Sequence, residues 1–130
     1  MNIPLPITAL YAALFAILFV MLMLVVIRLR RSLRIGLGDG GNRDLQQAIR
    51  VHGNAIECVP IFLVMLAILE LNHGSAMLLH LFGASFLFAR VLHAWGLYGS
   101  SGASLGRVAG TAVTMTLLVA LAIANLLKIF

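Results

Sequence analysis

Two uncharged apolar runs constrain the fold of this chain more than any other feature. Leu5 to Ile27 contains no charged residue, and the same is true of Val108 to Leu127. A helix needs about 20 predominantly apolar residues to cross the roughly 30 Å hydrocarbon core of a bilayer, and both runs have this length. Only 10% of the residues are charged, far below the level of ordinary soluble domains. We therefore expect a membrane-spanning helix near each end of the chain.

The middle of the chain holds two less pure apolar stretches and little else. No internal repeat and no soluble domain are visible. The sequence thus predicts an all-α membrane protein, an antiparallel four-transmembrane-helix bundle that forms a single domain over 1–130. The expected spans are about 6–30, 45–71, 74–98 and 104–128. Asp44 is the expected N-cap of the second helix, and Glu70, near its far end, is expected to extend into water.

The basic residues indicate how the bundle is oriented in the membrane. Six of the nine Lys and Arg lie between the first and second spans or at their ends, namely Arg28, Arg30, Arg31, Arg34, Arg43 and Arg50. Loops rich in Lys and Arg remain in the cytoplasm. We therefore expect the first connection to be cytoplasmic and both termini to face the other side. This topology accounts for the net charge of +5 without a nucleic-acid partner.

The second span carries an unusual group of polar residues in the segment "RVHGNAIECVP", residues 50 to 60. Arg50, Asn54 and Glu57 follow an i, i+4, i+7 pattern and fall within about 60° of one another around a helix. His52 points away from them. Polar groups at membrane depth are costly and normally face a bundle interior or a wet cavity. This face is therefore the first candidate for a functional site.

The third and fourth spans repeat the pattern toward the same end of the bundle. Arg90 and His93 are i, i+3 neighbours, whereas Arg107 shares a face with Thr111 and Thr114. In one interpretation these polar faces only pair with one another to hold the helices together. However, the arginines at 50, 90 and 107 have only Glu57 as a carboxylate within this end of the spans, since Glu70 lies at the far end, and unpaired buried charge is expensive. The surplus of positive charge suggests an anionic ligand.

The side chains limit the chemistry of that ligand. Arginine binds carboxylates through two parallel hydrogen bonds, a glutamate in a basic site can accept an ammonium group, and asparagine both donates and accepts. This combination suits a zwitterionic peptide with more than one carboxylate, such as glutathione. An organic phosphate or an acidic lipid headgroup fits nearly as well on these grounds.

The same residues resemble those of a known family. "RVHGNAIECVP" resembles the signature Arg-x-x-x-Asn-x-x-Glu-x-x-Pro on the second helix of the MAPEG superfamily, the membrane-associated proteins of eicosanoid and glutathione metabolism. "RRSLRI" resembles that family's basic segment after the first span. "ARVLHAWG" and "GRVAGT" are similar to its third-helix and fourth-helix arginine segments. The resemblance covers essentially the whole chain and points to a short bacterial-type member, hence to the bacterial inner membrane.

The resemblance implies a homotrimer that holds glutathione between neighbouring subunits near the cytoplasmic side. By position, Arg50, Asn54 and Glu57 would hold the polar ends of the tripeptide, with Glu57 taking the γ-glutamyl ammonium. The other positions that it implicates in glutathione binding are Arg28, Arg30, His52 and His93. Arg107 would lie beside the glutathione sulfur, where a guanidinium favours the nucleophilic thiolate.

The activity implied is attack of the glutathione thiolate on a lipophilic electrophile dissolved in the bilayer, or reduction of a lipid hydroperoxide. Two other classes of function remain open. The chain resembles in size a small four-span multidrug transporter, but such transporters carry a lone Glu in the first span, which here has no carboxylate. A membrane protein that binds glutathione or a lipid without catalysis is the second. The four histidines show no spacing typical of haem ligation, and we expect no metal site.

Overall fold

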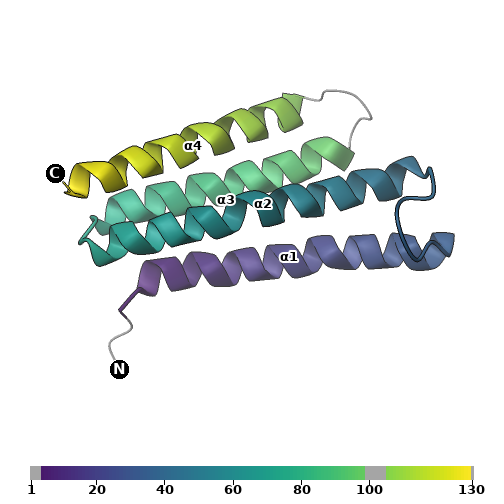
Figure 1. The fold of residues 1–130 in the computed structure, drawn as a ribbon, viewed down its shortest axis with the longest axis horizontal. Helices are drawn as coiled ribbons and strands as arrows, with labels where there is room; N and C mark the ends of the chain where they lie inside the picture. The colour runs from purple at the N-terminus through teal and green to yellow at the C-terminus, as the bar shows by residue number, and fades with distance from the viewer. Residues whose placement is uncertain (1–3, 99–104, 130) are drawn as a thin grey trace.

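A computed structural model describes residues 4–98 and 105–129, except for the side chains at 97, 98, 105, 107 and 129. Its four helices are α1 (Pro6–Leu33), α2 (Arg43–Leu71), α3 (Ala76–Tyr98) and α4 (Leu105–Ile129). They lie side by side and alternate in direction, so that the start of α1 and the end of α4 are at the same end of the bundle (Figure 1). The predicted all-α architecture with four long helices is confirmed.

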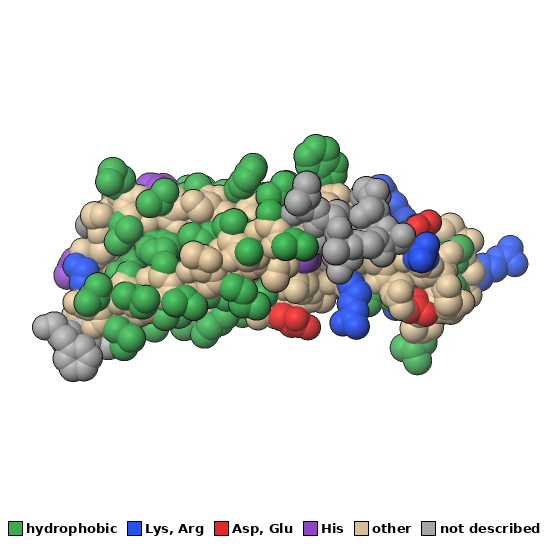
Figure 2. All heavy atoms as spheres, turned by 90° about the horizontal axis from the view of Figure 1, so that it is seen from above, with side chains coloured by type: hydrophobic (Ala, Val, Ile, Leu, Met, Phe, Trp, Pro, Cys, Tyr) green, Lys and Arg blue, Asp and Glu red, His purple; other side chains and the backbone are tan. Residues whose placement is uncertain are grey.

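The exposed side chains show what kind of environment surrounds the helices. All four helices are long and apolar enough to cross a membrane, and large apolar side chains such as Met77 (82% exposed), Phe88 (67%) and Val119 (60%) point outward. Hydrophobic side chains cover much of the bundle, whereas most of the charged ones gather toward the end that holds the α1–α2 connection (Figure 2). Soluble monomers rarely expose so continuous an apolar surface. The protein is therefore an integral membrane protein.

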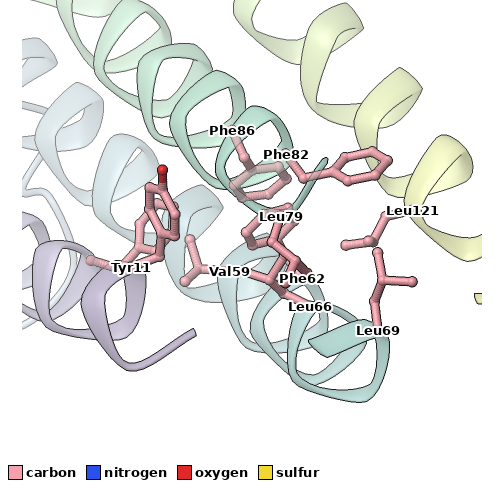
Figure 3. Packing of buried hydrophobic residues seen from close by; sticks show 10 residues of the cluster. Tyr11, Val59, Phe62, Leu66, Leu69, Leu79, Phe82, Phe86 and Leu121 are labelled. Carbon is pink, nitrogen blue, oxygen red and sulfur yellow. The ribbon is translucent and has the colours of Figure 1, made fainter. Parts of the chain in front are cut away.

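The helices are not equivalent in their packing. α2 and α3 contact each other, and each also contacts α1 and α4, whereas among the described residues no Cα atom of α1 comes within 8 Å of one in α4. The centre contains three fully buried phenylalanines: the rings of Phe62 and Phe86 stack with centroids 3.9 Å apart, and Phe15 meets both edge-on. Figure 3 shows how Phe62 and Phe86 face each other from α2 and α3. α2 and α3 thus form the middle of the bundle, flanked on opposite sides by α1 and α4.

The start of α2 differs from the sequence-based prediction. Asn42, not Asp44, is the N-cap, because its side-chain oxygen accepts a hydrogen bond of 3.0 Å from the Leu45 amide. Asn is among the best N-cap residues for this reason. Asp44 instead lies in the first turn of the helix, where its negative charge complements the helix dipole. The helix accordingly begins two residues earlier than predicted.

Glu70 remains partly exposed, but it also has a role that the sequence did not predict. Its carboxylate lies at the start of α1, where it accepts hydrogen bonds from the backbone amides of Ile7 (2.9 Å) and Thr8 (2.7 Å). Leu5, the N-cap of α1, provides no side-chain hydrogen bond, and Pro6 has no N–H to satisfy. Glu70 from the end of α2 therefore caps α1 and ties these two helix ends together.

A glycine allows α1 to approach α3 closely. A Cβ added at Gly83 on α3 would lie only 2.2 Å from the ring of Tyr11 on α1, so no side chain fits there. The Tyr11 hydroxyl donates to the backbone carbonyl of His80 over 3.1 Å and lies 3.1 Å from Nδ1 of the same residue. This contact fixes α1 against α3 at the end of the bundle where Glu70 caps α1.

Candidate polar site between α2, α3 and α4

Arg90 on α3 forms the centre of a polar cluster inside the bundle. Only 3% of the residue is exposed. One terminal nitrogen, Nη1, donates to the side-chain oxygen of Asn54 on α2, and the other, Nη2, donates to the Gly110 carbonyl (3.1 Å) and to the Thr114 hydroxyl, both on α4. Its guanidinium carbon also lies 5.9 Å from the centroid of the Phe86 ring. Arg90 therefore links three helices through one planar group.

This arrangement shows how the bundle accommodates one of the arginines in the predicted surplus of positive charge. Within the described residues no carboxylate lies within ion-pair distance of Arg90, and its acceptors are neutral oxygens of the protein itself. The Nε atom is buried and has no hydrogen-bond partner among the residues that the structure describes. The neutral oxygens satisfy hydrogen bonds of the guanidinium, and their dipoles stabilise its charge in place of a carboxylate. Arg90 is thus an internal structural cation rather than a group open to a ligand.

Close packing of α3 against α4 makes this cluster possible. A Cβ added at Gly110 would lie 2.8 Å from His93 Cβ and 2.9 Å from the Ala89 carbonyl oxygen. Small residues let membrane helices approach to this distance, and here the approach brings the Gly110 carbonyl to Arg90. Beside it, the Thr111 hydroxyl lies 3.2 Å from Nδ1 of His93. The polar faces predicted on the third and fourth helices therefore meet each other.

Arg50 and Glu57 lie outside this cluster. Both side chains are exposed, and neither makes an ion pair or a hydrogen bond within the described part of the chain. The two charges are on the predicted common face of α2, but they do not pair with each other. Asn54 is half-buried and lies between them in sequence, with its carbonyl oxygen turned inward to Arg90. The polar face of α2 therefore points out of the bundle, and Asn54 connects it to the interior.

The other sequence-predicted site residues are spread over the same half of the bundle. Arg28 on α1 is exposed, whereas half-buried Arg30 donates to the Gly38 carbonyl over 2.9 Å and so holds the α1–α2 connection. His52 is half-buried, about 200° around α2 from Arg50 by helical geometry. His93 is buried, 7% exposed, against Thr111. Within the described residues, Arg28, Arg30 and His52 make no hydrogen bond or ion pair with Arg50 or Glu57.

Arg107, the predicted catalytic residue, lies in the first turn of α4. Its side chain is outside the described residues, and so is the segment just before α4. Its place on the helix is one turn before Gly110 and Thr111, at the end of the bundle that holds the α1–α2 connection. The backbone therefore puts Arg107 at the same end as the Arg50–Asn54–Glu57 face.

The sequence reasoning missed the linking role of Arg90. A signal was present in the helical pattern of α3. The buried side chains Leu79, Phe82 and Phe86 follow i, i+3, i+7, and Arg90 comes four residues after Phe86 on the same face. Residues at i and i+4 lie above one another on a helix. An arginine that continues an apolar face is directed into the bundle, where it needs acceptors from neighbouring helices.

The fold and this cluster define a class: an integral membrane bundle of four helices with a buried arginine shared by three of them and a charged outer face on the second. Comparison with known proteins identifies the family. The model of the MAPEG family matches residues 8–127, which is nearly the whole chain. The chain therefore belongs to the MAPEG family, and the resemblance seen in its sequence motifs is confirmed.

Two curated relatives agree with this assignment. Both are called inner membrane protein YecN, one from Escherichia coli K12 and one from Escherichia coli O6:H1. Each is 38% identical to this chain over 92 residues, which is 71% of this chain and 70% of the relative. The similarity thus extends well beyond the motif around Asn54.

Proposed function

We propose that this protein is a membrane-embedded glutathione-dependent transferase or peroxidase that acts on lipophilic electrophiles. The observation that carries the proposal is the charged outer face of α2, with Arg50 and Glu57 exposed and unpaired within the described residues. Membership of the MAPEG family favours glutathione as the ligand. We place the protein in a bacterial inner membrane, as the name of its relatives suggests.

The depth of Glu57 supports a covered site. By helical rise it lies about 9 Å beyond Val51, where the apolar part of α2 begins. A carboxylate at that depth is not left against lipid, because charged side chains in a membrane normally face protein, water or a ligand. In our proposal a neighbouring subunit of a homotrimer covers this face, and glutathione fills the space between them. The α1–α2 connection and this site are then on the cytoplasmic side, by the distribution of Arg residues.

Each proposed residue has a distinct task. Glu57 pairs with the ammonium group of the tripeptide, and the Arg50 guanidinium binds a carboxylate through two hydrogen bonds. Asn54 contacts the ligand between them. Arg107 stabilises the thiolate of bound glutathione, which is the nucleophile. The thiolate attacks the electrophilic carbon of the substrate, forms a carbon–sulfur bond and displaces the leaving group.

Removal of either outer charge tests the binding site. Arg50→Ala and Glu57→Ala are each expected to raise the Kd for glutathione at least tenfold, or about 1.4 kcal/mol, because each leaves a charged ligand group unpaired. Isothermal titration calorimetry of the purified protein in nanodiscs measures this. Arg43→Ala is the matched control, since Arg43 is also exposed on α2 but lies two turns before Arg50. Wild-type affinity in both site variants would exclude this face as the glutathione site.

Removal of Arg107 tests the chemistry separately. Arg107→Ala is expected to reduce the thiolate absorbance of bound glutathione at neutral pH and to lower the rate of conjugation with an aromatic electrophile about tenfold, with a smaller change in Kd. The expectation follows because a guanidinium beside a thiol stabilises the anion rather than the neutral ligand. Ultraviolet titration and a conjugation assay measure the two effects. Binding without any turnover in the wild type would instead assign the protein to the non-catalytic class.

A further inference from the structure

The contact between Arg90 and Asn54 determines which atoms of Asn54 a ligand can meet. A guanidinium can only donate hydrogen bonds, so the atom of the Asn54 amide that faces Arg90 must be the oxygen, as the structure has it. The amide nitrogen therefore faces away from Arg90. It makes no hydrogen bond within the described residues, and it is not among the buried unpaired atoms, which are Thr8 Oγ1, Arg90 Nε and Asn125 Oδ1.

The amide cannot turn over without cost. Rotation by half a turn would place the NH2 group of Asn54 against the Arg90 guanidinium, donor against donor. It would also leave Nη1 of a buried cation without its acceptor, which is unfavourable. Arg90 itself is held by the Gly110 carbonyl and the Thr114 hydroxyl of α4. The orientation of an amide on α2 is thus set by α4 through the guanidinium of α3.

We propose that Arg90 is a positioning residue that holds Asn54 as a pure hydrogen-bond donor, so that the ligand atom facing Asn54 is a carboxylate or carbonyl oxygen. This rests on the proposed glutathione site. It narrows the expectation that Asn54 both donates and accepts, because Arg90 occupies the side of the amide oxygen. It also assigns a specificity: a ligand that presents an ammonium or an N–H group at this position is rejected, because both partners would then donate.

The neighbours of Asn54 agree with this assignment. The residue lies four positions after Arg50 and three before Glu57 on α2, so the free N–H groups face the ligand between a cation and a carboxylate. The Arg50 guanidinium and the N–H groups of Asn54 both favour oxygen atoms of the ligand, whereas Glu57 favours a positively charged group of the ligand. The site therefore discriminates two kinds of ligand group along one helix face.

Asn54→Asp separates the donor role from a structural one. The new carboxylate still accepts from Arg90 and forms an ion pair with it, so the midpoint of thermal unfolding is expected to stay equal to the wild-type value or to rise. It has no N–H to donate. The Kd for glutathione is expected to rise at least tenfold, whereas the Kd for glutathione diamide, in which both carboxylates are carboxamides, changes less than threefold because an amide N–H can donate to the new carboxylate.

Arg90→Gln tests the positioning role. A neutral amide can donate or accept, so Asn54 is free to turn. The ratio of the Kd for glutathione diamide to the Kd for glutathione is therefore expected to move toward one by at least threefold. Calorimetry with both peptides measures these ratios in wild type, N54D and R90Q. If R90Q does not fold, the ratio of Kd values in N54D alone tests whether Asn54 is a donor. Thr114→Val removes one hydrogen-bond partner of Arg90, so the ratio in that variant tests whether Arg90 positions Asn54.

The outcomes distinguish this inference from the proposed function. The inference would be overturned if N54D changed the Kd values for glutathione and glutathione diamide equally, or if R90Q kept the wild-type ratio of the two. Either result would leave glutathione binding itself unaffected as a conclusion. Absence of glutathione binding in the wild type would remove the proposed function. A changed ratio cannot arise from a general loss of stability, because that would weaken both peptides alike.

Discussion

Replacement of Gly110 by valine is expected to lower the free energy of unfolding by about 3 kcal/mol, the upper end of the usual range for overpacking a tight interior. The reason is the distance between two backbones. Any Cβ at this position would lie 2.9 Å from the Ala89 carbonyl oxygen and 3.0 Å from His93 Cα. These are main-chain atoms, so α4 must move away from α3 as a whole.

The displacement has a second effect at the polar cluster. The Gly110 carbonyl accepts from Arg90 over 3.1 Å, and Thr114, one turn further along α4, provides the other acceptor. Movement of α4 leaves a buried cation short of acceptors, which adds to the loss from packing. The Gly110→Val protein is therefore expected to lose glutathione binding along with stability.

Circular dichroism during heating in detergent measures the unfolding midpoint of this variant. Gly53→Ala is the matched control, because Gly53 is also within a helix but a Cβ there meets nothing within 4 Å. The control is expected to be as stable as the wild type or more so, since alanine is the better helix former. An unchanged midpoint in Gly110→Val would show that α3 and α4 are not packed as described.

Replacement of Glu70 by alanine is expected to lower the free energy of unfolding by about 2–3 kcal/mol, because two hydrogen bonds to one charged group are lost. The amides of Ile7 and Thr8 have no other partner among the described residues once the carboxylate is removed. Unsatisfied amides at a helix start within a membrane are especially unfavourable. The first turn of α1 should therefore fray.

Hydrogen–deuterium exchange of the peptide that covers the start of α1 measures this effect directly. Exchange is expected to accelerate strongly in Glu70→Ala and to a smaller degree in Glu70→Gln, which retains one acceptor oxygen. A peptide from the middle of α4 provides the internal control. Equal exchange at the start of α1 in all three proteins would mean that Glu70 does not cap the helix in the membrane.

Much of the fold followed from local properties. A helix in a bilayer satisfies its own backbone hydrogen bonds, so the length of an apolar run is enough to predict a span, and four such spans are present. The motif around Asn54 is equally local, and it led to the correct family. The N-cap of α2 was wrong by two residues, because Asn42 and Asp44 are both suitable residue types and only the geometry chooses between them.

The relation between the polar residues was predicted only in part. The spacing of Arg50, Asn54 and Glu57 places them on one face of α2, but nothing in that spacing says whether the face points inward. The structure turns it outward, with Arg50 and Glu57 exposed and only Asn54 reaching Arg90. The charge count did not predict that neutral oxygens of Asn54, Gly110 and Thr114 would hold Arg90 inside the bundle.

The sequence by itself thus determined the membrane-spanning class, the number of helices and the family, since each depends on residues close together in the chain. Only the tertiary structure decided the partners of Arg90 and Glu70. Glu70 meets Ile7 and Thr8 across more than 60 residues, and Arg90 meets Asn54 and Thr114 across 36 and 24. Such pairs depend on how helices rotate and approach one another, and that is set by glycines and ring contacts distributed over all four helices.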